Sequence, residues 1–193
     1  MLRSILFIKT AIAISHPSLS DSLRTSYATT LQAEAKKRSF DPVTVVAMVE
    51  NESRWNSRLV GGLNGQCIGL GQHCLHVYGY CTRTNYRGAR CQEKKAWLLN
   101  GTNNLMATSR AITDWRKTCR QITGKPALFY RWLHGYQGFG KYDKERRRWT
   151  VVCGMRPTRK GWVDVKRPRL VRKVMRRRIE LIKATERRLR RRR

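Results

Sequence analysis

The chain has 193 residues, 40% of them hydrophobic, so it can form one compact domain of ordinary size with a genuine core and carry appendages. Its 42 lysines and arginines outnumber its 12 aspartates and glutamates, which gives a formal net charge of +30. This composition excludes a wholly disordered basic tail and indicates a polyanionic partner. Nucleic acid, anionic lipid, lipopolysaccharide and acidic wall polymers all satisfy that charge equally.

Residues 1–21 have two interpretations, a signal peptide or an apolar N-terminal segment. An apolar run from Ile5 to Ile14 follows a short basic start, as in a signal peptide, but Lys9 interrupts it. The run is too short to span a bilayer. The alternative is an apolar strand or helix that packs on the domain, and the sequence leaves both open.

Helical patterns follow. Apolar residues recur every four positions and predict an amphipathic helix over residues 22–38. Asp41 followed by Pro42 predicts the start of a second helix, because the carboxylate can cap free amides and the fixed φ of proline suits a first turn. This helix should end near Arg54.

The middle of the chain is expected to be irregular and then helical. Seven glycines between residues 57 and 92 indicate a loop-rich stretch with short helices at most. Helical spacing returns over residues 94–120 and again over 127–133, before a glycine-rich segment at 134–140. No strand alternation is convincing.

Six cysteines are present: Cys67, Cys74, Cys81, Cys91, Cys119 and Cys153. Disulfides are the first interpretation, with buried thiols as a second. A third is a metal site that uses His73, Cys74, His76 and Cys81, although no Cys-x-x-Cys pair of the zinc-knuckle type occurs. The sequence does not choose among the pairings.

The C-terminal segment is strongly basic. Residues 154–193 contain 18 lysines and arginines and three acids, so they carry 15 of the 30 net charges. Val171, Met175, Ile179, Ile182 and Leu189 keep roughly helical spacing, which favours a basic amphipathic helix over a solvated tail. We expect an appendage that is dispensable for chemistry on soluble substrates.

Four short motifs follow one another along the chain. Residues 52–56 read Glu-Ser-Arg-Trp-Asn, 69–72 read Gly-Leu-Gly-Gln, 104–105 read Asn-Leu and 135–138 read Gly-Tyr-Gln-Gly. Their order and spacing resemble the lytic transglycosylase SLT domain of the lysozyme-like superfamily, in which Glu-Ser-x-Phe/Trp-Asn closes a helix. The later family motifs are Gly-Leu-Met-Gln, an Asn-Ile step and Ala-Tyr-Asn-x-Gly. The resemblance covers about residues 22–142.

The resemblance implies a fold and a reaction. The expected fold is mainly α: a lysozyme-like helical catalytic domain over 22–150, with an irregular cysteine-containing insertion and a basic helical tail over 151–193. The expected enzyme is a peptidoglycan-cleaving lytic transglycosylase. It would break the β-1,4 bond between N-acetylmuramic acid and N-acetylglucosamine and leave a 1,6-anhydromuramoyl end.

The same resemblance assigns the site residues. Glu52 would protonate the glycosidic oxygen and then, as carboxylate, take the proton of the sugar's C6 hydroxyl. Ser53, Gln72, Tyr136 and Gln137 would bind the substrate. Nothing in the sequence calls for a metal or a cofactor.

An independent argument supports a protonated acid at the end of the second helix. Val45, Met48 and Val49 share a helical face with Glu52, and apolar surroundings disfavour the carboxylate anion. Glu50 has equivalent apolar neighbours, so periodicity does not separate the two. The family motif places the acid directly before serine and selects Glu52.

Three departures from the family keep other outcomes open. Gly71 stands where the family has methionine, Gln137 where it has asparagine, and Ser57 where proline often follows. A looser cleft would admit water, so a muramidase hydrolase like goose-type lysozyme is one alternative. The other is a non-enzymatic polyanion-binding protein on a degenerate scaffold.

Partners and location follow from these expectations. We expect a monomer that binds peptidoglycan glycan strands and, through its tail, an anionic envelope polymer or membrane; nucleic acid is a further candidate. Cysteines in disulfides would suit an exported protein, periplasmic or extracellular, or one associated with a phage.

Overall fold

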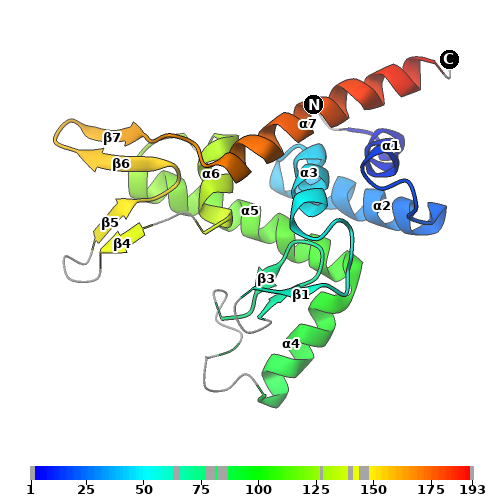
Figure 1. Cartoon of the computed structure of the whole chain (residues 1–193), viewed down its shortest axis with the longest axis horizontal. Helices are drawn as coiled ribbons and strands as arrows, with labels where there is room; N and C mark the ends of the chain where they lie inside the picture. The colour runs from blue at the N-terminus through cyan, green and yellow to red at the C-terminus, as the bar shows by residue number, and fades with distance from the viewer. Residues whose placement is uncertain are drawn as a thin grey trace. The chain divides into compact units, whose positions relative to one another are not determined.

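The computed structural model describes residues 3–62, 66–76, 81, 87–126, 128–138, 141–143 and 148–191 (Figure 1). The chain forms two compact units. Unit 1 consists of Met1–Ser109 and Arg177–Arg193, and unit 2 of Arg110–Arg176. Helices dominate the described residues and the strands are short and antiparallel, so the expectation of a mainly α protein is confirmed.

Three helices build the centre of unit 1. They are α1 (Ile5–Ser15), α2 (Asp21–Arg38) and α3 (Pro42–Glu52), and α1 packs on both of the others. In α3 every residue from Pro42 to Val49 is buried. The apolar run of α1 therefore lies in the core, as the packed-segment interpretation of residues 1–21 expects, with Ile8 and Ile12 fully buried.

The predicted start of α3 is confirmed. Asp41 is the N-cap, its Oδ1 accepts the backbone amide of Val43 at 3.1 Å, and Pro42 occupies the first turn. The predicted helix over 22–38 is also confirmed as α2, which Ser20 caps by accepting the amide of Leu23. Local side-chain chemistry thus sets where both helices begin.

A small antiparallel sheet follows α3. It has the order β1 (Val60–Gly61), β2 (Cys67–Ile68) and β3 (His73–Cys74). Disulfide Cys67–Cys74 joins β2 to β3, and a second disulfide joins Cys81 to Cys91 of α4 (Ala89–Leu99). The disulfide interpretation of the cysteines is therefore confirmed.

The helix expected over 94–120 is two helices. Asn100 ends α4, and α5 (Gly101–Thr123) begins at the next residue. A Cβ atom at Gly101 would lie 2.1 Å from the hydroxyl oxygen of Tyr27, so only glycine allows α5 to start against α2. Periodicity continues across this break, which is why the sequence did not reveal it.

Unit 2 contains the rest of α5, helix α6 (Phe129–Tyr136) and two hairpins. The hairpins are β4 (Lys141–Asp143) with β5 (Arg148–Val151), and β6 (Met155–Thr158) with β7 (Gly161–Asp164). Disulfide Cys119–Cys153 joins α5 to the turn between them. The sequence analysis missed these strands because none exceeds four residues and β6 and β7 are mostly exposed, so no alternation of buried and exposed positions marks them.

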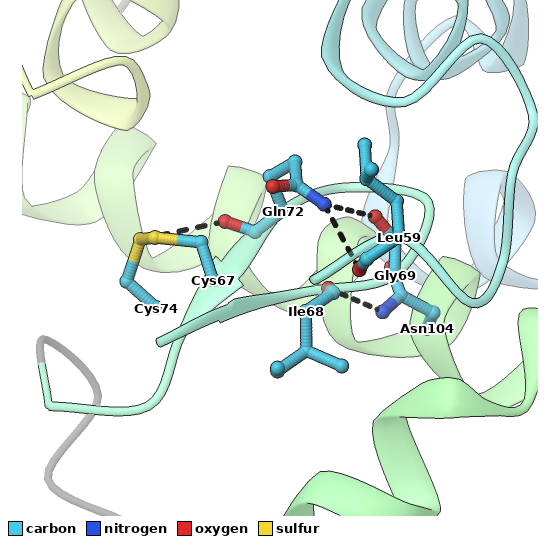
Figure 2. Close-up of a disulfide and its surroundings, with 7 residues drawn as sticks. All are labelled: Leu59, Cys67, Ile68, Gly69, Gln72, Cys74 and Asn104. Atoms are coloured by element: carbon cyan, nitrogen blue, oxygen red, sulfur yellow. Dashed lines mark hydrogen bonds between the residues drawn. A yellow bond between two sulfur atoms is a disulfide. The ribbon is translucent and has the colours of Figure 1, made fainter. Parts of the chain in front are cut away.

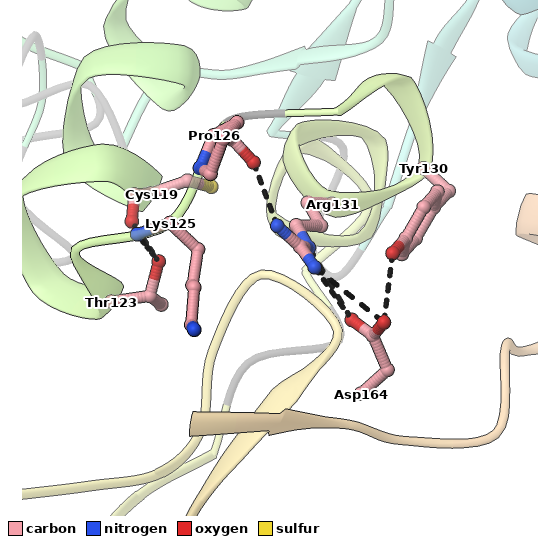
Figure 3. Close-up of polar contacts among 7 residues, drawn as sticks. All are labelled: Cys119, Thr123, Lys125, Pro126, Tyr130, Arg131 and Asp164. Carbon is pink, nitrogen blue, oxygen red and sulfur yellow. Dashed lines mark hydrogen bonds and ion pairs between the residues drawn. The ribbon is translucent and has the colours of Figure 1, made fainter. Parts of the chain in front are cut away.

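A polar cluster fastens the second hairpin to α6 (Figure 3). Tyr130 donates its hydroxyl to Asp164 at 2.9 Å, and Arg131 donates to the same carboxylate at 3.3 Å and to the carbonyl of Pro126 at 2.8 Å. Burial opposes ionisation of Asp164, but the bonds from Arg131 and Tyr130 outweigh it and lower the pKa of this carboxyl. The carboxylate form thus holds β7 against α6.

The basic C-terminal segment contains the expected helix, α7 (Arg169–Arg190). Its buried residues are Val171, Val174, Leu181 and Thr185, whereas Ile179, expected on the apolar face, is 49% exposed. Arg178 bonds Asp41 and donates to Thr44 at 3.0 Å. The second half of α7 therefore belongs to unit 1 and braces the start of α3.

These units differ from the predicted domains 1–21, 22–150 and 151–193. Composition changes at residue 151, but disulfide Cys119–Cys153 and the ion pair between Arg177 and Glu50 join residues on either side of that point. The predicted domain bounds, and the expectation that residues 154–193 are an appendage dispensable for chemistry on soluble substrates, stay predictions.

None of the helices in the described ranges is long and apolar enough to cross a membrane.

The packing of α7 can be tested with two neighbouring substitutions. Leu181→Ala removes a fully buried side chain and should lower the free energy of unfolding by about 2–4 kcal/mol. Ile179→Ala, at an exposed position of the same helix, should change it by no more than about 0.5 kcal/mol. Urea denaturation with the disulfides intact measures both. Equal effects would contradict a packed α7.

Candidate active site

Glu52 is the last residue of α3 and is half-buried. The chain turns sharply after it: Arg54 and Trp55 both have positive φ, at 50° and 66°. Two successive non-glycine residues in this region cost on the order of 1–3 kcal/mol each, and the surrounding structure must supply that energy. We call residues 53–55 the acid turn.

Ser53 lies within the acid turn. It is 5% exposed, and its Oγ donates to the carbonyl of Val49 at 3.2 Å. This contact ties the hydroxyl to the last turn of α3, as a serine at a helix end commonly is. The substrate role predicted for Ser53 stays a prediction.

Trp55 anchors the acid turn in the core. Its side chain is 5% exposed and stacks on Tyr27 with 5.9 Å between the ring centroids. Its Nε1 donates to the Oγ of Ser15 at 2.8 Å. Burial raises the pKa of Tyr27, against a smaller lowering by Ser57, so the ring that faces Trp55 is a neutral phenol.

Glu50 is hydrogen-bonded to residues of two other helices. Its carboxylate accepts the Oγ of Ser15 at 2.7 Å and the Nε of Arg177 at 2.9 Å to both oxygens. Burial opposes the charge on Arg177, but Glu50, with a smaller effect from Glu180, outweighs it and raises the pKa of the guanidinium. Glu50 is thus the ion-pair partner of Arg177, which periodicity alone did not predict.

The segment 69–72 is held by a buried asparagine (Figure 2). Asn104 is fully buried, and its Nδ2 donates to the carbonyls of Ile68 at 2.9 Å and Leu98 at 2.8 Å. Its Oδ1 accepts the amide of Gly71 at 2.7 Å. Gly69 has φ 71°, and a Cβ atom there would lie 2.3 Å from the Asn104 amide nitrogen. Glycine is required for this close approach.

Gln72 braces the same segment. Its Nε2 donates to the carbonyls of Gly69 at 2.9 Å and Leu59 at 3.3 Å, as Figure 2 shows. The amide of Gly69 also donates to Leu59 at 2.8 Å, and the amide of Leu59 donates to Asn56 at 3.2 Å. Hydrogen bonds therefore connect motif 52–56 to motif 69–72 through Leu59.

His73 lies beneath this segment as a neutral side chain. Its Nε2 is 3.0 Å from the Oγ1 of Thr108, whose hydroxyl donates to the carbonyl of Asn104 at 2.9 Å. Burial, with a smaller effect from the charge of Lys94, lowers the pKa of His73 to about 3. The histidine thus extends the polar support of Asn104.

The metal alternative for this region has little support. Cys74 and Cys81, two of its four candidate ligands, are in disulfides. Across the part of the chain that the structure describes, no three His, Cys, Asp or Glu side chains are placed to hold a metal ion.

The remaining predicted site residues belong to unit 2. Tyr136 ends α6 and Gln137 is its C-cap, and both are half-buried. Gly135 packs on Trp115, because a Cβ atom there would lie 2.4 Å from the indole ring. Motif 135–138 thus has a defined place in unit 2, and its substrate role stays a prediction.

The structure adds three residues that the sequence analysis did not select. Ser15, Tyr27 and Arg177 contact the acid turn or Glu50 from other helices. Each looks ordinary in the sequence, and no local pattern could have marked it.

Comparison of the chain with protein-family models, curated proteins and solved structures finds no match.

The buried His73 predicts an acid dependence of stability. Its pKa is about 3 in the folded protein and near the ordinary 6.5 when unfolded, so between these values only the unfolded chain binds the proton. The free energy of unfolding should fall as pH drops through this window, by up to about 1.4 kcal/mol per pH unit from this residue.

Urea denaturation between pH 4 and pH 7 measures this dependence. His73→Gln should flatten the slope. His16→Gln, which alters a histidine hydrogen-bonded to the exposed Ser18, should keep it. An unchanged slope in His73→Gln would contradict a histidine that is neutral in the folded state.

Proposed function

We propose that this protein is a peptidoglycan-cleaving lytic transglycosylase whose catalytic acid and base is Glu52. The observation that carries the proposal is the hydrogen-bonded connection of three motifs, 52–56, 69–72 and 104–105, through Leu59 and Asn104. Chance matches at these positions would have no reason to contact one another in the fold.

The arrangement around Glu52 also supports a lysozyme-like fold. The acid closes a helix, a small antiparallel sheet with motif 69–72 follows, and α5 supplies the Asn104 that holds this motif. This is the order that the family resemblance implies for motifs 52–56, 69–72 and 104–105.

The state of the neighbouring carboxylates favours a reaction with one carboxyl group. Besides Glu52, the carboxylates of α3 and its cap are Asp41 and Glu50, and they are ion-paired with Arg178 and Arg177. Neither suits the role of a second catalytic carboxylate, which most glycosidases need as nucleophile or base. A substrate-assisted route needs only one.

The proposed reaction proceeds within the glycan. Glu52 gives its proton to the glycosidic oxygen as the bond from C1 of N-acetylmuramic acid breaks. The C6 oxygen of the same sugar forms the new bond to C1, and its hydroxyl proton passes to the Glu52 carboxylate. The product carries a 1,6-anhydro bridge and Glu52 is protonated again, so no water is consumed.

The other site residues have supporting roles in this proposal. Gln72 shapes the sugar site by fixing the loop of motif 69–72, and Ser53 fixes the end of α3. The roles of Tyr136 and Gln137 as substrate-binding residues are those that the family resemblance implies for motif 135–138. Gly71, which replaces the family's methionine, leaves room for water, so muramidase hydrolysis is the alternative outcome.

The disulfides support an exported protein, because they persist in oxidising compartments. Periplasmic, extracellular and phage-associated locations all give access to peptidoglycan.

Product analysis tests the proposal. Wild-type protein should release anhydromuramoyl fragments from purified peptidoglycan, and Glu52→Gln should reduce the rate by at least about a thousandfold, because an amide cannot donate the proton. Mass spectrometry identifies the ends. Reducing ends would show hydrolysis instead, and no products from the folded wild type would favour the polyanion-binding alternative.

The charge on α7 suggests how the enzyme reaches its substrate. Arg177 and Arg178 pair with α3, whereas Arg187, Arg188, Arg190 and Arg191 are exposed at the end of the helix. Three of these arginines line an open hollow with Ile14 and Ala184. We propose that this basic end holds the enzyme on anionic polymers of the cell envelope.

Neutralising the four exposed arginines to glutamine should weaken binding to whole cell walls at least about tenfold at low salt and flatten its salt dependence. Cleavage of soluble fragments should be unchanged. The control removes four exposed charges elsewhere, at Lys36, Lys37, Arg90 and Lys125. Equal loss of wall binding in both variants would assign the effect to net charge instead of the α7 end.

A further inference from the structure

A single chain of hydrogen bonds joins the acid turn to the C-terminal helix. The indole of Trp55 donates to Ser15 at 2.8 Å, and Ser15 donates to Glu50 at 2.7 Å. Arg177 donates to both Glu50 oxygens at 2.9 Å. The donors and acceptors are consistent along the chain: the two nitrogen groups donate, Ser15 accepts one bond and donates another, and the Glu50 carboxylate only accepts. We call these four residues the Glu50 network.

Two members of the Glu50 network lie on either side of Glu52 in the sequence. Glu50 lies two residues before the acid and Trp55 three residues after it, so both ends of this short segment are tied to Ser15. Residues two apart on a helix point in different directions, so Glu50 can bind Ser15 and Arg177 while Glu52 projects elsewhere. The network thus constrains the backbone that carries Glu52.

The constraint acts on a strained conformation. A bulky residue with φ 66°, such as Trp55, relaxes to an ordinary conformation unless its side chain is held. Burial, the stack on Tyr27 and the bond to Ser15 hold it. Ser15 accepts from Trp55 while it donates to Glu50, so loss of the carboxylate's anchor would also disturb the tryptophan.

We infer that Arg177 is a positioning residue for Glu52, which acts through Glu50, Ser15 and Trp55 to hold the acid turn. The inference rests on the proposed function, in which Glu52 reacts. It gives the basic helix α7 a second role beside polyanion binding: one of its arginines belongs to the support of the catalytic acid.

Arg177→Met tests this role in the full-length protein with its disulfides formed. It keeps the aliphatic stem but removes the donors to Glu50. On soluble glycan fragments kcat should fall about tenfold with little change in KM, because misplacing an acid affects the chemical step more than binding. Arg177→Lys keeps the charge and should restore most of kcat.

The control is Lys183→Met, which removes one charge from an exposed position of the same helix and should leave kcat unchanged. The indole N–H resonance of Trp55, assigned by its loss in Trp55→Phe, gives a second readout. It should shift in Arg177→Met and keep its position in Lys183→Met, since only the former loses the anchor of Glu50. Thermal denaturation establishes that each variant is folded.

The outcomes separate the inference from the proposed function. Suppose that the wild type cleaves glycan and that folded Arg177→Met has a normal kcat and an unshifted Trp55 resonance. This result would leave the proposed function intact and overturn the positioning role. A fall in kcat that Arg177→Lys and Arg177→Met share equally would also overturn it. Absence of cleavage by the wild type would overturn the proposed function, and the positioning role with it.

Discussion

The ion pair between Arg177 and Glu50 is the interaction on which the arrangement around Glu52 depends. It joins residues 127 positions apart in the sequence and brings the C-terminal helix onto α3. A half-buried carboxylate without this partner would face a desolvation cost, and Ser15 and Trp55 would lose the anchor to which they are bonded. The same contact gives Glu50 a structural role in unit 1, and the family motif selects Glu52 as the candidate for chemistry.

Asn104 has a similar supporting role for the segment 69–72. One fully buried amide satisfies two carbonyls and one amide from β2, α4 and the segment 69–72, and His73 extends this support through Thr108. Because unpaired polar groups are costly inside a protein, such a network specifies one loop conformation. Together with Leu59 it places three sequence motifs in one hydrogen-bonded structure. Buried contacts thus hold both the strained acid turn and the segment 69–72 in one conformation.

Local signals in the sequence predicted local structure. The Asp41-Pro42 cap and the helix over residues 22–38 were visible in short patterns, and the end of α3 was expected near Arg54, two residues after its end at Glu52. Short patterns did not mark Ser15 and Arg177, since their importance depends on contacts with Glu50 across 35 and 127 residues. The break at Gly101 depends on a tyrosine of another helix, and the short hairpins of unit 2 lack an apolar alternation. Charge composition did not distinguish the arginines of α7 from one another, although some form ion pairs with α3 and its cap and others are exposed.

The most direct test of this account compares Glu50→Gln with Glu52→Gln in two measurements, the free energy of unfolding and the rate of glycan cleavage. The account predicts that Glu50→Gln lowers the free energy of unfolding by about 1–3 kcal/mol, because the ion pair with Arg177 is lost. Glu52→Gln should abolish cleavage in a protein that still folds, because the amide cannot donate the proton. Cleavage at the wild-type rate by Glu52→Gln, or an unchanged free energy of unfolding in Glu50→Gln, would contradict the assignment of the two acids.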